Sequence, residues 1–237
     1  MVRRLRRGVW LLELGLIAPL ASNAYLVDER AFDGPSDDVV LVDTGLWWNE
    51  PTIRDELRAV GYGPADIDRV LVTHYDLDHV GGLNRLVPEF DGPVSVGTDD
   101  LDLLSGRADP PFFHHKGLFH RVSRRLFPLP ELPLEPLADG DTVGGFTAHH
   151  TPGHNPGHVV YHHAAASTAF LGDLVWAADD GGLTTPFWAD SYDMDQLDES
   201  VVALADRLPE FDVAAMGHGE PLVTGGSEAL RSLAGRL

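Results

Sequence analysis

The sequence contains no cysteine and only one lysine in 237 residues. Without cysteine the chain forms no disulfide and offers no thiolate to a metal, so histidine, carboxylate or water must bind any metal ion. Basic residues are scarce in general, because 17 Lys and Arg face 37 Asp and Glu and leave a formal net charge of -20. This charge argues against nucleic acid as a partner, since phosphate binding needs a basic surface.

The charged residues are also biased in kind. The chain has 26 Asp against 11 Glu, and 16 Arg against the single Lys116. An aspartate-rich, lysine-poor surface is typical of proteins that stay hydrated in concentrated salt, where screening removes the self-repulsion of the charge. We therefore expect an acidic, halophile-like surface. The alternative is an ordinary acidic protein from a GC-rich genome, in which Arg replaces Lys.

The first 24 residues allow two interpretations. A basic start, an apolar stretch and small residues outline a signal peptide. Glu13 interrupts the apolar stretch, which is also too short to span a bilayer. Residues 8–16 and 22–29 have the apolar content of two strands, and we favour that interpretation. We expect a cytoplasmic protein that acts on a small-molecule substrate, with neither a nucleic-acid nor a membrane partner, and we leave a homodimer open.

The rest of the chain alternates short apolar strands with helical segments. Its length suits one domain, residues 1–237, and 43% hydrophobic residues can form a sizeable core. Further strands are expected at residues 37–45, 67–74, 92–97, 142–154, 158–164, 168–173 and 211–219. Helices are expected at residues 50–63, 81–90, 193–208 and 225–237.

One segment, residues 105–136, fits no regular element. It is rich in proline and phenylalanine, and this apolar content predicts a packed, lid-like insertion rather than a disordered linker. We expect it to cover the functional site and to set the choice of substrate. For its histidines, His114, His115 and His120, a surface position is the default expectation, and contact with substrate is the alternative.

Ligand-type side chains follow the ends of several expected strands. The stretch LVTHYDLDHVGG (71–82) holds four of them, and TPGHNPGH, TAFLGD and VAAMGHG each add one. Turns at one edge of a sheet can gather such groups from distant parts of the sequence into a metal site. Seven groups exceed the need of one tetrahedral ion and suit two ions that share a carboxylate. They are His74, Asp76, Asp78, His79, His154, Asp173 and His218.

These motifs, together with the VDTG turn at Asp43, resemble those of the metallo-β-lactamase superfamily along nearly the whole chain. The resemblance implies an α/β (α+β) fold, a four-layer αββα sandwich with a binuclear metal site at one edge of its sheets. The chain departs from the family pattern at Asp76, where the usual residue is a second histidine. It therefore resembles a branch with H-x-D-x-D-H in place of H-x-H-x-D-H.

The resemblance also implies which residues bind each ion. The first ion would be bound by His74, Asp76 and His154. The second would be bound by Asp78, His79 and His218, with Asp173 bridging the two. A carboxylate at position 76 is a harder ligand than the usual imidazole. Zinc is therefore expected for the two divalent ions, with iron or manganese as alternatives. Alternatively, Asp76 only accepts a hydrogen bond from a ligand histidine.

Several other residues are expected to play supporting roles. We expect Asp43 to orient the ligand histidines and His158 to support the turn after His154. The remaining histidines are expected to line strand faces or meet solvent, and these are His149, His150, His162 and His163.

The leading function is a metal-dependent hydrolase. Two ions lower the pKa of a bridging water, so that hydroxide is available near neutral pH, and one ion polarises a substrate carbonyl. Asp78 is the expected catalytic residue, because it can orient this nucleophile or accept its proton, and Tyr192 is a candidate donor to the leaving group. An ester, lactone or thioester fits best. The alternatives are a flavodiiron-like oxidoreductase, which an acid at position 76 favours, and a non-catalytic metal-binding protein.

Overall fold

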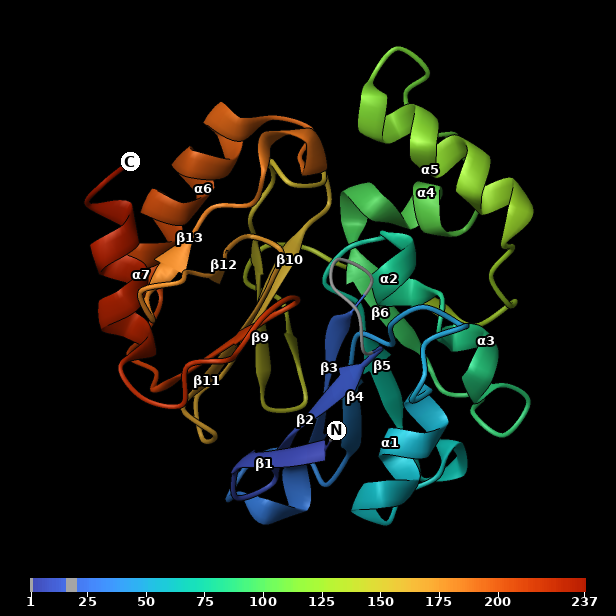
Figure 1. The fold of residues 1–237 in the computed structure, drawn as a ribbon. Coiled ribbons are helices and arrows are strands. Elements are labelled where there is room, and N and C mark those ends of the chain that lie inside the picture. Colours follow the sequence, from blue (N-terminus) through green and yellow to red (C-terminus); the bar gives the residue numbers. More distant parts are fainter. Residues whose placement is uncertain (1, 16–20) are drawn as a thin grey trace.

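The first half of the chain forms a β-sheet of mixed direction. The computed structural model describes residues 2–15 and 21–237, and within them this sheet has seven strands in the order β1-β2-β3-β4-β5-β6-β7 (Figure 1). Strands β1 to β4 pair antiparallel, and β4 to β7 pair parallel. The bounds are β1 (Val2–Arg6), β2 (Val9–Leu14), β3 (Ser22–Asp28), β4 (Val39–Val42), β5 (Arg69–Leu71), β6 (Val94–Gly97) and β7 (Leu134–Leu137).

The second half forms another sheet, with five described strands in the order β14-β11-β10-β9-β8. β14 runs parallel to β11, and the other neighbours are antiparallel. A small hairpin of β12 and β13 stands apart from both sheets. The bounds are β8 (Thr142–Val143), β9 (Phe146–His150), β10 (Val159–His163), β11 (Thr168–Gly172), β12 (Trp176–Ala177), β13 (Leu183–Thr184) and β14 (Val213–Met216).

Helices cover the outer face of each sheet. α1, α3 and α4 lie over the seven-stranded sheet, α6 and α7 lie over the five-stranded sheet, and α5 lies beyond the strand ends (Figure 1). The bounds are α1 (Ile53–Val60), α2 (Leu77–Val80), α3 (Leu83–Leu86), α4 (Leu101–Leu104), α5 (His115–Leu126), α6 (Met194–Arg207) and α7 (Gly226–Ala234). The four-layer αββα arrangement expected from the sequence is confirmed.

The continuous apolar runs of the central strands are explained by burial on both faces. In β4, Val40 and Val42 pack between the two sheets, whereas Val39 and Leu41 pack under the helices. Since side chains alternate between the faces of a strand, every position of such a strand must be apolar. β2 follows the same alternation, which confirms the strand interpretation for the described part of the N-terminal segment. Residues 16–20 of that segment lie outside the described residues.

The expectation that residues 105–136 contain no regular element is wrong. The segment contains α5 and the first residues of β7. α5 buries Lys116, His120 and Ser123 and leaves apolar side chains exposed, which inverts the usual pattern of a surface helix. Its apolar residues therefore do not mark the buried face. No described helix has the length and hydrophobicity to cross a membrane.

Candidate metal centre

The HYDLDH motif follows the C-terminal end of β5, an inner strand of the seven-stranded sheet that runs parallel to β4. Asp76 is the N-cap of α2, a single helical turn that carries Asp78 and His79. The glycine pair after the motif lets this turn approach the end of β4 closely. A Cβ atom on Gly82 would lie 2.0 Å from the carbonyl oxygen of Thr44. Any side chain at that position would push the turn away from the sheet edge.

The first group of candidate ligands is His74, Asp76 and His154. The Nε2 atoms of the two histidines are 3.2 Å apart. Asp76 Oδ2 lies 3.4 Å from His74 Nε2 and 3.2 Å from His154 Nε2. A tetrahedral ion with bonds of about 2.0–2.2 Å places its ligand atoms roughly 3.3–3.6 Å apart. All three side chains are buried, and their spacing is close to what such an ion requires.

The second group is Asp78, His79 and His218, with Asp173 beside it. Asp78 Oδ2 lies 3.8 Å from His79 Nε2 and 3.2 Å from His218 Nε2. Asp173 Oδ2 lies 3.6 Å from His79 Nε2 and 3.2 Å from His218 Nε2. The same oxygen is 3.8 Å from His154 Nε2 of the first group. Asp173 therefore lies between the two groups, where a bridging carboxylate would have to be.

The four histidines of the two groups are each held by the ring nitrogen that faces away from the centre. The Nδ1 contacts are Thr73 Oγ1 for His74 (3.0 Å), Asp43 Oδ2 for His79 (2.9 Å), Ser191 Oγ for His154 (3.4 Å) and Ala21 O for His218 (2.8 Å). Carbonyl and carboxylate oxygens only accept, so neutral His79 and His218 donate from Nδ1 and keep the Nε2 lone pair free. This arrangement is typical of metal-binding histidines and agrees with the orienting role expected for Asp43.

Two buried atoms of the second group have no hydrogen-bond partner in the described part of the chain. They are His79 Nε2 and Asp173 Oδ1. Buried polar atoms are rarely left unpaired, because the loss of water costs on the order of 1–3 kcal/mol each. A metal ion bound by these side chains would satisfy both. The donor set of imidazole and carboxylate fits zinc, iron and manganese.

The two groups place opposite charges close together and away from water. Burial raises the pKa of Asp173, but the imidazoles of His218 and His79 outweigh it and hold that pKa well below its ordinary value. Burial lowers the pKa of His79, but nearby carboxylates, Asp173 foremost, raise it well above its ordinary value. In the first group, burial and the charge of His79 lower the pKa of His74 to about 4. A metal binds the ionised carboxylate and the neutral imidazole, so the shifts at Asp173 and His74 favour binding, whereas an ion that binds His79 must displace its proton.

Asp76 is surrounded by donors that the sequence did not lead us to expect. Lys116 Nζ lies 2.8 Å from Asp76 Oδ2. His120 Nε2 lies 3.2 Å from the other oxygen, Oδ1, and Asn155 Nδ2 donates to that oxygen at 2.5 Å. Burial raises the pKa of Asp76, but the charges of His120 and Lys116 outweigh it and hold that pKa well below its usual range. The segment 105–136 therefore reaches the site through α5.

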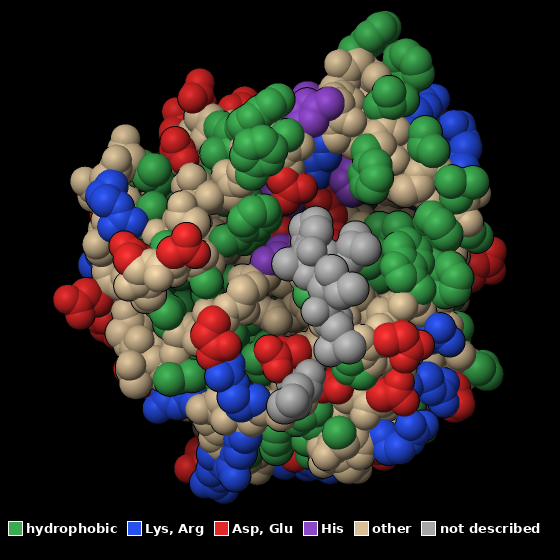
Figure 2. Space-filling view, viewed as in Figure 1, with side chains coloured by type: hydrophobic (Ala, Val, Ile, Leu, Met, Phe, Trp, Pro, Cys, Tyr) green, Lys and Arg blue, Asp and Glu red, His purple; other side chains and the backbone are tan. Residues whose placement is uncertain are grey.

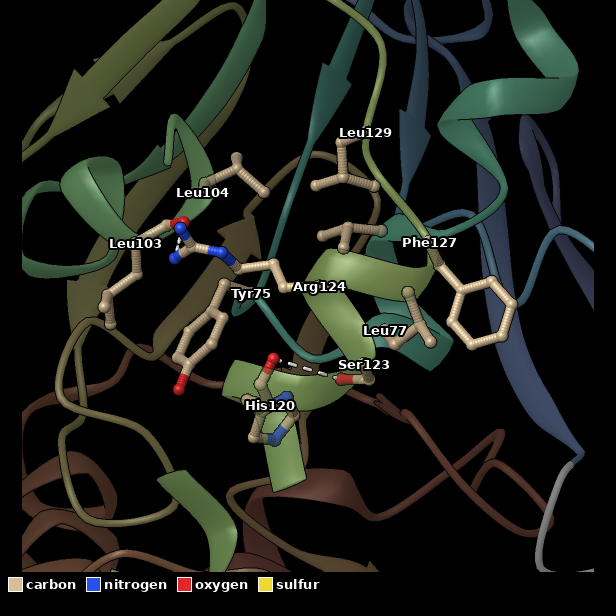
Figure 3. Close-up of a pocket in the computed structure, with 10 residues that line it drawn as sticks. Tyr75, Leu77, Leu103, Leu104, His120, Ser123, Arg124, Phe127 and Leu129 are labelled. Atoms are coloured by element: carbon tan, nitrogen blue, oxygen red, sulfur yellow. Dashed lines mark hydrogen bonds between the residues drawn. The ribbon is translucent and has the colours of Figure 1, made fainter. Parts of the chain in front are cut away.

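α5 contacts α2 and η4, the short helix Trp188–Asp190, and reaches α4 through Arg124 (Figure 3). Leu77 of α2 and Leu103 of α4 line a pocket under the helix. Arg124 of α5 donates to the carbonyl oxygen of Leu103 at 3.0 Å. The ring of His120 packs 5.0 Å from that of Tyr75, between centroids. These contacts fix the face of α5 that points toward Asp76.

A cavity of about 690 Å³ opens beside the second group. Asp78 and His218 form part of its wall. The wall also contains acidic and apolar side chains, which include Glu13, Asp190, Glu220, Leu14, Trp176 and Phe187. Figure 2 shows acidic and histidine side chains gathered in a hollow of this face, with hydrophobic side chains around it. Among the described wall residues there is no Lys or Arg.

The remaining predicted residues lie outside the two ligand groups. His158 contacts Thr151 Oγ1 at 2.8 Å and accepts from the backbone N–H of Asp173 at 3.2 Å, which supports the turn as expected. Tyr192 contacts the hydroxyl of Tyr75 at 2.5 Å and is not part of the cavity wall. On the strands, His162 and His163 are buried, and His149 and His150 are half-buried. His114 and His115 contact the backbone oxygens of Tyr192 and Ala189.

Comparison with known proteins places the chain among metal-dependent enzymes. The family model of the metallo-beta-lactamase superfamily matches residues 17–218. The probable metallo-hydrolase YybB of Bacillus subtilis (strain 168) is 32% identical over 177 residues, which cover 73% of this chain and 71% of that protein. The crystal structure of TTHA1623 in a di-iron-bound form is 30% identical, with a TM-score of 0.66, and the match covers 90% of this chain and 94% of that one. The family protein TTHA1429 from Thermus thermophilus shares the fold, with 22% identity, a TM-score of 0.69, and coverage of 98% of this chain and 80% of that one.

Proposed function

The chain is a metallo-hydrolase that belongs to the metallo-beta-lactamase superfamily, and on this premise we propose that it uses two divalent ions to hydrolyse a neutral ester, lactone or thioester. The observation that supports this most directly is the placement of Asp173 between two ligand groups. When bound, two such ions supply an activated water and polarise a carbonyl group.

Asp78 is the residue that we assign to proton transfer. Its side chain is 29% exposed, whereas that of Asp173 is 3% exposed, and it forms part of the cavity wall. Among the three candidate carboxylate ligands, Asp78 is therefore the one that a substrate in the cavity meets. Asp78 can orient a water molecule toward the substrate and accept its proton.

Zinc is the ion that we propose first, with iron and manganese as alternatives. Four imidazoles and three carboxylates suit all three metals, and the acid at position 76 adds a hard oxygen ligand to the first group. Direct ligation by Asp76 is part of this proposal. The similar protein TTHA1623, crystallised in a di-iron-bound form, supports keeping iron as an alternative.

The wall of the cavity supports a neutral small-molecule substrate with an apolar portion. No Lys or Arg lines the described wall to pair with a carboxylate or phosphate on the substrate, and Glu13 and Asp190 add acidic groups to it. Trp176 and Phe187 offer apolar surface to an acyl chain or ring. Nucleic acid is disfavoured by the same charge, and we propose no membrane partner.

Metal-free protein, prepared with a chelator, is the starting point of the test. It is reloaded separately with zinc, iron(II) and manganese and assayed on lactones, thioesters, phosphodiesters and β-lactams. We expect hydrolysis of neutral esters, lactones or thioesters only after reloading, with a lower melting temperature in the metal-free state. Each positive substrate is paired with an analogue that carries an added carboxylate, which should react more slowly.

Undiminished hydrolysis by fully metal-free protein would contradict the proposal. Asp173→Asn is the matched variant, because it keeps the size of the side chain while removing the negative charge that lies between the two ligand groups. It should lose more activity than any other single carboxylate change. A redox-active di-iron protein with no hydrolysis would favour the oxidoreductase instead.

A further inference from the structure

The only lysine of the chain is buried inside the first ligand group. Lys116 lies near the start of α5 and is 4% exposed. Its Nζ lies 2.8 Å from Asp76 Oδ2 and 2.8 Å from His154 Nε2. It also donates to the backbone oxygens of Asp190 at 2.6 Å and His154 at 3.2 Å. A buried ammonium needs a counter-charge and acceptors for its three N–H groups, and this position supplies both.

The atoms that Lys116 contacts are the atoms that a first metal ion needs. A neutral imidazole has a single lone pair, and His154 Nε2 either accepts a hydrogen bond from Lys116 or binds an ion. Asp76 Oδ2 likewise either accepts from Lys116 or binds an ion, because the other oxygen, Oδ1, is already in contact with His120 and Asn155. The ammonium and a divalent ion therefore compete for the same pair of ligand atoms.

The second group has no such competitor. Across residues 2–15 and 21–237, no Lys or Arg nitrogen forms an ion pair with Asp78 or Asp173. His79 Nε2 and Asp173 Oδ1 make no hydrogen bond there at all. An ion that binds the second group therefore displaces no Lys or Arg from these two atoms.

We propose that Lys116 acts as an internal cation that competes with metal at the first group, so that the two groups differ in affinity and are filled in order. One ion binds tightly to the second group. A second ion binds the first group only after Lys116 withdraws from Asp76 and His154. Because Lys116 lies on α5, the position of this helix then differs between the one-ion and two-ion forms. This inference uses the two ligand groups of the proposed function but does not depend on the substrate.

Equilibrium dialysis at buffered free zinc, with the bound metal counted by mass spectrometry, tests the proposal. Wild-type protein should show two separate steps, one ion per chain at low free zinc and a second ion at much higher concentration. Lys116→Met should shift the second step to roughly 10- to 100-fold lower free zinc, the effect of removing charge-assisted hydrogen bonds from the competing state. The first step should not move. Arg125→Met is the matched control, because Arg125 is an exposed cation on the same helix, and it should behave as wild type.

Manganese gives an independent readout by electron paramagnetic resonance. Two ions about 3.5–4 Å apart couple magnetically, so the coupled signal should appear at lower manganese in Lys116→Met than in wild type. Lys116→Gln should give the same shift, and a retained first step shows that either variant is folded. Two equal steps in wild-type protein would overturn the proposal whether or not the variants fold. The proposal would also be overturned if, in a folded variant, the second ion bound at the same free zinc concentration as in wild type. Failure of the proposed hydrolase function would show in the substrate screen and leave these isotherms unchanged.

Discussion

Asp43 contacts one ring nitrogen of His79, Nδ1, and leaves Nε2 as the nitrogen that faces the candidate metal centre. Its Oδ2 accepts from His79 Nδ1 and from the hydroxyl of Thr73, and its Oδ1 accepts from the backbone N–H of Thr73. Its φ of 59° lies in the left-handed region, which asparagine also tolerates better than most residues. Asp43→Asn therefore changes the hydrogen bonding with little backbone strain.

We expect Asp43→Asn to weaken metal binding at the second group by roughly 10- to 100-fold. A carboxamide nitrogen in place of Oδ2 would donate to His79 Nδ1 and move the ring proton to Nε2, the atom that must bind the ion. Metal-buffered dialysis measures the loss, and the melting temperature of the metal-free variant serves as the folding control. Unchanged affinity in a folded variant would show that Asp43 does not set the tautomer of His79.

The candidate ligands could be predicted from the sequence because their spacing is local or tied to strand ends. His74, Asp76, Asp78 and His79 occupy one turn after β5, and the fold needs only to bring three more residues to it. Lys116 could not be predicted in this way. It belongs to no motif, and its being the only lysine was the one available signal.

At the scale of elements, helices could be predicted from the sequence where capping residues mark their ends and their apolar residues mark the buried face. α1 has the capping box of Thr52 with Asp55 and ends at Gly61, whose φ is 96°. α5 lacks both signals, since its N-cap His114 makes no side-chain cap. Its inward face is polar because it meets the ligand groups, so its hydrophobic residues indicate the wrong side. A helix that serves a site rather than a core does not follow the usual periodicity.

The short helix η4 (Trp188–Asp190) connects α5 to the substrate cavity. Backbone oxygens of this helix bind His115 and Lys116 of α5. Phe187, just before it, lines the cavity while remaining 60% exposed. Phe113, in the segment 105–136, is 99% exposed and is not part of the cavity wall. The cavity thus points to Phe187, rather than Phe113, as the determinant of preference for apolar substrates.

We expect Phe187→Ala to lower kcat/KM by about tenfold for long acyl chains, because about 1–2 kcal/mol of apolar contact is lost. Short-chain substrates and metal content should change little. Phe113→Ala is the matched control and should leave both classes of substrate unaffected. An equal loss for short and long chains would point to damage at the metal centre, and an equal effect of Phe113→Ala would remove the case for Phe187.

At the scale of the whole molecule, the candidate metal centre lies between the two halves of the sandwich. His74, Asp76, Asp78 and His79 follow the seven-stranded sheet, whereas His154, Asp173 and His218 follow strands of the five-stranded sheet. Each ligand group draws on both halves, so bound ions resist separation of the sheets. This is why loss of metal should lower the melting temperature as well as activity.

Bound ions would stabilise the folded chain, whereas its net charge of -20 destabilises it. Repulsion among the like charges favours expansion of the compact state. Salt weakens this repulsion and also weakens the exposed ion pairs at the surface, such as Arg58 with Asp55. Exposed pairs contribute only about 0–1 kcal/mol each, and acidic residues exceed basic ones 37 to 17, so we expect relief of repulsion to win.

We expect the melting temperature to rise as KCl increases from about 0.05 M toward 1 M, over which the screening length falls from more than 10 Å to about 3 Å. For a chain of this size, each kcal/mol gained raises the melting temperature by roughly 2–4 °C. Thermal unfolding of metal-free protein isolates this effect from metal binding. Sucrose is the uncharged control, because it stabilises proteins without screening charge. A melting temperature that stays flat with KCl, or that rises only as much as with sucrose, would reject the view that this acidic surface is adapted to salt.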